Sequence, residues 1–190
     1  HLAPFAPLLR ALGGEFVPSI PIVNELTEAL CANALEQRLC ENSVFFLAGY
    51  DAAHLNQTRI PVYFHFLPST ASTWEIAHWA QLVESKRFAR FDYGTVAANK
   101  AAYGNSTVPD FPLEKIPPQA RIALFRGRND FLSSIPDTER LIAIFRRTGV
   151  NFTDHIVADD KWTHVDFIIG SEVGRLVYDP VLELLDKLTL

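Results

Sequence analysis

The chain has 190 residues, enough for one domain or two small ones. Hydrophobic residues make up 48% of it, which supports a buried core and argues against disorder. The net charge of -5 and the isoelectric point near 5.7 argue against a nucleic-acid-binding protein, which usually needs a basic face. No stretch of the sequence approaches the roughly 18–20 apolar residues that a membrane-spanning helix requires.

The first residue is His1, and nothing at that end resembles a signal peptide. We therefore expect a chain that begins partway through a longer gene product, although a mature, cleaved protein would look similar. Three Asn-x-Ser/Thr sequons favour the secretory pathway and possible glycosylation, at Asn56, Asn105 and Asn151. The two cysteines, Cys31 and Cys40, fit either a pair of buried thiols or a disulfide of the kind that persists in that pathway.

Residues 1 to about 113 carry most of the prolines and few strand-like runs. Residues 21–39 have helical spacing, and the weak alternation over residues 62–67 predicts a short strand or extended segment. Ser72-Thr73-Trp74-Glu75 is a capping-box pattern, which predicts a helix to about Ser85. We expect its buried face to consist of Ile76, Ala80 and Val83.

From about residue 114 onward, strand and helix patterns alternate, as is typical of an α/β layer. The proline-rich stretch just before it is the expected joint between two parts. The expected elements are a buried strand over 121–125, a helix over 134–147, a strand over 154–157 and one or two helices over 171–188. Gly149 provides a stop for the first helix, and Pro180 kinks or restarts the last.

Two polar residues with catalytic potential follow these two strands. Asp130 comes after the first strand and His164 after the second. A carboxylate and an imidazole at one edge of a sheet can form the acid–base part of a Ser-Asp-His triad. On spacing alone, an aspartate after a strand is more often a turn or cap residue. Asp166 could position the loop or serve as a cap. The six histidines show no metal-binding spacing, so we predict neither a metal nor another cofactor.

Several motifs in order make the chain similar to a known family. Gly127-x-x-Asp130-x-Leu132 and Trp162-x-His164-x-Asp166 resemble the aspartate and histidine motifs of the acid lipases, the family of gastric and lysosomal acid lipase. Further resemblances lie in residues 55–63 and 78–94, and the cysteine spacing matches the family's disulfide, which implies a Cys31–Cys40 bridge.

The resemblance implies a partial α/β-hydrolase fold: a mostly helical cap or lid domain over residues 1–113, then the last strands and helices of the core over 114–190. It makes Asp130 the triad acid and His164 the general base.

The sequence also departs from that family. Residues 69–72 lack the family's usual glycine, no G-x-S-x-G occurs, and the oxyanion-hole segment is missing. We therefore expect the C-terminal portion of a serine lipase acting on triacylglycerols or sterol esters, secreted or lysosomal, inactive without an N-terminal half that carries the nucleophile. Its cap would contact the lipid interface. A non-catalytic lipid-binding protein derived from a lipase cap is the alternative, and an incomplete gene model is a third.

Overall fold

The computed structural model describes residues 15–16, 49, 51–66 and 71–189. The chain forms two compact units, one of His1–Glu25 with Phe66–Leu113 and the other of Leu26–His65 with Glu114–Leu190. One division thus falls between residues 113 and 114, while residues 51–65 belong to the second unit. The assignment of residues 1–113 to a lipase cap stays a prediction. The helix predicted over residues 21–39 lies outside the described residues.

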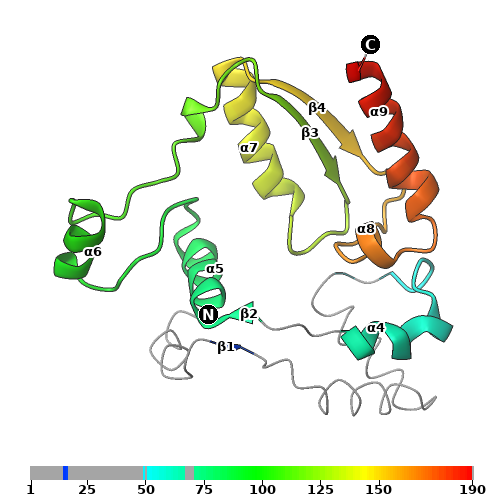
Figure 1. Cartoon of the computed structure of the whole chain (residues 1–190), viewed down its shortest axis with the longest axis horizontal. Coiled ribbons are helices and arrows are strands. Elements are labelled where there is room, and N and C mark those ends of the chain that lie inside the picture. The colour runs from blue at the N-terminus through cyan, green and yellow to red at the C-terminus, as the bar shows by residue number, and fades with distance from the viewer. Residues whose placement is uncertain (1–14, 17–48, 50, 67–70, 190) are drawn as a thin grey trace. The chain divides into compact units, whose positions relative to one another are not determined.

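The first unit contains a small antiparallel pair and two helices (Figure 1). Strand β1 (Glu15–Phe16) pairs with β2 (Ala71–Ser72), and the chain continues directly into α5 (Thr73–Ser85). The Ser72 hydroxyl accepts a hydrogen bond from the Trp74 backbone N–H at 3.2 Å, which caps α5 as the sequence predicts. The predicted face is wrong in part: Ala77 and Ala80 are buried, but Val83 is 59% exposed.

The loop after α5 is held to that helix by side-chain hydrogen bonds. His78 Nε2 lies 2.8 Å from the Ala89 carbonyl oxygen. The Gln81 amide donates to the Asp92 carbonyl and accepts from the Asp92 N–H, both at 2.8 Å. Helix α6 (Val96–Tyr103) follows, capped by Thr95. These contacts give His78 a structural role.

The second unit contains a parallel strand pair, β3 (Arg121–Arg126) and β4 (Asn151–Ile156), paired from Arg121↔Asn151 to Arg126↔Ile156. Both predicted strands are confirmed, although β4 begins three residues earlier than expected. The prediction that the first strand is buried is wrong. Only Arg126 of β3 is buried, because within the described residues the strand is hydrogen-bonded on one side alone.

Helix α7 (Ile135–Thr148) connects these strands and confirms the predicted helix. Ser134 caps its start, and Gly149 ends it in the left-handed conformation with φ of 73°. Figure 1 shows α7 on one side of the strand pair and α9 on the other. Phe145 of α7 packs on Phe152 of β4, with ring centroids 5.7 Å apart. The parallel strands therefore have the crossover helix that such a pair requires.

The chain ends in three helical segments: α8 (Asp166–Ile169), the π-helical η4 (Gly174–Tyr178) and α9 (Asp179–Thr189). Pro180 is the second residue of α9, which follows η4 without a gap, and Asp179 at the junction has helical backbone angles. Four buried residues, Val157, Trp162, Leu176 and Val177, form the hydrophobic cluster of this region. No helix among the described ranges is long and apolar enough to cross a membrane.

The strand predicted over residues 62–67 is wrong. The 3₁₀ turn η2 (Gln57–Arg59) continues into helix α4 (Ile60–Phe66). Asn56 caps this start through its side chain, and Pro61 falls in the first helical turn. Ile60 is 1% exposed and packs with Leu55. The helix-start signals at Asn56 and Pro61, together with the burial of Ile60, therefore favour a helix over the strand that the brief apolar alternation predicts. The last described 3₁₀ turn is η3 (Leu113–Lys115).

Gly127 provides a test of the packing between the two strand ends. A Cβ atom at this position would lie 2.4 Å from the Trp162 carbonyl oxygen, so backbone must shift to admit it. We expect Gly127→Ala to lower the free energy of unfolding by about 1–3 kcal/mol, in the range of overpacked interiors. Chemical denaturation measures the change.

Gly174→Ala is the matched control, because its Cβ would meet no atom within 4 Å. This variant should be neutral or slightly stabilising. Equal unfolding free energies for the two variants would show that Gly127 is not in close contact with the Trp162 carbonyl.

Candidate functional site

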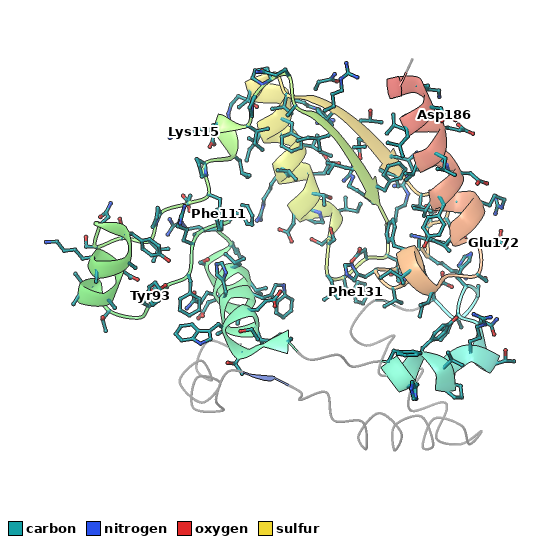
Figure 2. All side chains as sticks on the ribbon, viewed as in Figure 1. Tyr93, Phe111, Lys115, Phe131, Glu172 and Asp186 are labelled. Carbon is teal, nitrogen blue, oxygen red and sulfur yellow. The ribbon has the colours of Figure 1, made fainter. Side chains whose placement is uncertain are left out.

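The candidate site lies where β3 and β4 end. Because the strands are parallel and in register, the segments that follow them leave the same edge of the sheet. The Asn129 backbone N–H donates to the Trp162 carbonyl at 3.2 Å, which joins the two segments directly. Figure 2 labels Phe131 in the first of them, the residue that follows Asp130 in the sequence. The fold thus brings together two sequence positions 34 residues apart.

Asp130 and His164 form a hydrogen-bonded pair. His164 Nδ1 lies 3.0 Å from Asp130 Oδ2. The other carboxylate oxygen, Oδ1, accepts from the backbone N–H groups of Leu132 at 2.9 Å and Ser133 at 2.7 Å. The Asp130 side chain is 4% exposed and that of His164 is 49% exposed. The carboxylate is therefore fixed and buried, while the imidazole reaches the surface.

The pKa values of the two groups move apart. Burial pushes the pKa of Asp130 upward, but the hydrogen bonds from His164 and from the Ser133 and Leu132 N–H groups outweigh it, and the net pKa is below the ordinary value. The hydrogen bond to Asp130 raises the pKa of His164 against the opposing effect of burial. The pair therefore favours an ionised aspartate beside a histidine of increased basicity.

This arrangement has the chemistry of a general base. An ionised carboxylate only accepts hydrogen bonds, so the proton of neutral His164 resides on Nδ1 and the lone pair is on Nε2. In the described part of the chain, no hydrogen-bond partner of Nε2 is present. A hydroxyl placed there could transfer its proton to Nε2 while Asp130 stabilises the imidazolium. The geometry brings together both residues that the sequence singled out.

Of the two roles predicted for Asp166, positioning the loop and serving as a cap, the structure supports the first. Its Oδ2 accepts hydrogen bonds from the Thr163 backbone N–H at 2.7 Å and from the Thr163 hydroxyl at 2.6 Å. Asp166 is 1% exposed and begins α8, but the start of that helix has no side-chain cap, so the carboxylate fixes Thr163, the residue before His164. Burial raises the pKa of Asp166 despite the hydrogen bonds from Thr163. Asp166 therefore positions the loop.

Sequence reasoning missed a second histidine–aspartate pair beside this loop. His54 Nδ1 lies 2.6 Å from Asp51 Oδ2, and both residues are buried. The His54 ring meets the Trp162 ring edge-on with centroids 5.1 Å apart. The His54 carbonyl accepts from the Ser171 N–H at 2.9 Å. An Asp-x-x-His spacing was the only linear signal, and it is too common to be informative without the fold.

The remaining predicted site residues are the two cysteines and the three sequon asparagines. Cys31 and Cys40 fall outside the described residues, so their disulfide stays a prediction. Asn56, Asn105 and Asn151 are all exposed. The side-chain oxygens of Asn56 and Asn105 accept hydrogen bonds from the threonine two residues later. Exposure is the first requirement for glycosylation, which itself stays a prediction at all three sites.

Comparison with known proteins shows that the chain is similar to several lipases. The chain is 30% identical over 175 residues to Lipase lipl-1 of Caenorhabditis elegans, covering 90% of the chain and 41% of that protein. It is 29% identical over 182 residues to human lysosomal acid lipase/cholesteryl ester hydrolase, covering 95% and 44%. It is 28% identical over 170 residues to rat gastric triacylglycerol lipase, covering 90% and 41%. No protein-family model matches the chain.

These matches show that the chain is related to the acid lipase family, as the sequence motifs predict. The described residues combine helices with a small parallel sheet, which is compatible with part of an α/β fold. The chain spans less than half the length of the curated relatives that it matches.

The hydrogen bond between Asp130 and His164 generates a pH prediction. Replacing Asp130 by Asn removes the carboxylate that raises the pKa of His164, so this pKa should fall. NMR titration of the His164 ring resonances measures it.

In the native chain the stability from the raised His164 pKa is present at acidic pH and is lost as pH rises through that pKa. Stability from the lowered Asp130 pKa is present above the ordinary aspartate range and is lost on acidification. Both stabilising contributions are therefore present only at pH values between the aspartate range and the raised pKa of His164.

Asp160→Asn is the control, because Asp160 is exposed and pairs with Arg128 instead. It should leave the His164 titration unchanged. An Asp130→Asn variant with an unshifted His164 would contradict the pairing.

The exposed sequons give a separate prediction. Expression in a secretory eukaryotic host should add glycans at Asn56, Asn105 and Asn151, which peptide-N-glycosidase removes with a fall in mass. Changing each asparagine to Gln should remove one glycan from the mass spectrum. An unmodified mass for the secreted native chain would contradict the predicted sites.

Proposed function

We propose that this chain contributes the acid and the base of a serine ester hydrolase that acts on triacylglycerols or sterol esters in lipid catabolism. The observation that carries the proposal is the hydrogen bond from exposed His164 to buried Asp130. The relationship to the lipases supports the reaction class, because those relatives are named for lipase or cholesteryl ester hydrolase activity. The proposed fold is the last part of an α/β-hydrolase core.

In this proposal, a serine hydroxyl outside these 190 residues meets Nε2 of His164. The imidazole takes the hydroxyl proton as the oxygen attacks the ester carbonyl, and Asp130 stabilises the resulting imidazolium. His164 then returns the proton to the leaving alcohol. The absence of a G-x-S-x-G motif in this sequence, and its short span relative to the lipases, support a nucleophile and oxyanion hole located elsewhere. The chain alone is then inactive.

The first unit is the proposed lipid-contacting cap. Helix α5 exposes Trp79 and Val83, four residues apart on one face, and Phe88 after the helix is 55% exposed. Apolar side chains of this size at a surface suit contact with a lipid interface. A secreted or lysosomal location is part of the same proposal, supported by relatives whose names are lysosomal acid lipase and gastric lipase.

A chimera tests the proposal. This chain replaces the matching segment of Lipase lipl-1, whose remaining sequence supplies the rest of a lipase, and hydrolysis of a triacylglycerol is followed by acid release. We expect activity in the chimera and none from the 190-residue chain alone. Asp130→Asn in the chimera should lower kcat by about 10⁴-fold, since the base loses its orienting carboxylate.

Asp160→Asn in the chimera is the matched control, because this exposed aspartate follows β4 but does not contact His164. It should retain full activity. A folded chimera that binds lipid saturably but cleaves no ester would overturn the proposal in favour of a non-catalytic lipid-binding protein.

A further inference from the structure

Three side chains outside the Asp130–His164 pair converge in the second unit. Asp51 and His54 come from the segment before η2, and Asp159 comes from the loop after β4. One potential ligand atom from each of the three lies within 4.8 Å of the others. Asp51 and His54 are buried, and the Asp159 side chain is 31% exposed. Asp159 is more than one hundred positions from Asp51 and His54 in the sequence, so no local metal-binding motif marks the cluster.

The two nitrogens of His54 have different surroundings. Asp51 Oδ2 lies 2.6 Å from Nδ1, so the carboxylate holds the proton on that nitrogen and leaves the lone pair on Nε2. Asp159 Oδ2 lies 3.6 Å from Nε2, which is too long for a hydrogen bond. Two ligands about 2.1 Å from a tetrahedral zinc ion stand about 3.4 Å apart, close to this separation.

The cluster also has an excess of negative charge. Asp51 and Asp159 form no ion pair with a lysine or arginine in the described parts of the chain, and both have His54 as their ion-pair partner. Buried carboxylates are normally paired or coordinate a metal. A carboxylate bonded to one imidazole nitrogen, with the other nitrogen free for coordination, is the usual arrangement behind a metal-bound histidine.

We propose that His54 Nε2 and Asp159 bind a divalent cation of the zinc type, with Asp51 orienting the imidazole. An imidazole ligand favours zinc over calcium or magnesium, which prefer oxygen. Water completes the coordination from the exposed side of Asp159. The cation joins the segment of His54 to the loop that leads to His164, in addition to the contact between the His54 and Trp162 rings. This inference is independent of the proposed hydrolase function.

Isothermal titration calorimetry of the 190-residue chain with ZnCl₂ tests the proposal. We expect one saturable site that MgCl₂ and CaCl₂ do not compete for. Asp159→Asn should weaken zinc binding at least tenfold, because a neutral amide replaces an anionic ligand, and Asp51→Asn by about 10–100-fold through loss of the orienting carboxylate. Because Asp159 is partly exposed, its variant should keep the native circular dichroism spectrum.

Asp160→Asn is the matched control, since the Asp160 side chain is 88% exposed and pairs with Arg128. It should bind zinc as the native chain does. Absence of saturable binding in the folded native chain would overturn the proposal. Binding that is unchanged in a folded Asp159→Asn variant would also overturn it, because it would place the zinc on another histidine.

Discussion

The parallel register between β3 and β4 is the constraint on which the candidate site depends. It carries the two following segments to one sheet edge, where the Asn129 N–H and the Trp162 carbonyl join them. Gly127 permits this approach because a Cβ atom would collide with the Trp162 carbonyl oxygen. The backbone arrangement places Asp130 and His164 within hydrogen-bond distance.

The two residues of the pair differ in exposure: Asp130 is buried and His164 reaches the surface. Asp130 receives two backbone N–H groups, which compensate its carboxylate for the loss of water and orient it. His164 remains half-exposed, as the proposed role of a base that reaches a reacting group requires. Asp166 accepts two hydrogen bonds from Thr163, the residue that precedes His164. The site is therefore rigid on the side of the acid and open on the side of the base.

Sequence patterns predicted the parts of this structure with local causes. The capping box at Ser72 correctly predicted the start of α5, and successive strands correctly placed Asp130 and His164 at one edge. The failures have physical reasons. The alternation over residues 62–67 was overridden by helix-start signals at Asn56, and β3 is less buried than its apolar run implied. The Asp51–His54–Asp159 cluster could not be predicted, because it exists only once distant segments pack together.

The proposed acid–base pair requires one form of His164: a neutral ring with its proton on Nδ1, held by Asp130, and with Nε2 free to accept. Long-range ¹H–¹⁵N correlation spectra of the imidazole, recorded at a pH above its titration, distinguish the two tautomers directly. We expect the Nδ1–H form to predominate for His164. A predominant Nε2–H form, as free histidine adopts, would show that Asp130 does not orient the ring and would contradict the proposed acid–base pair.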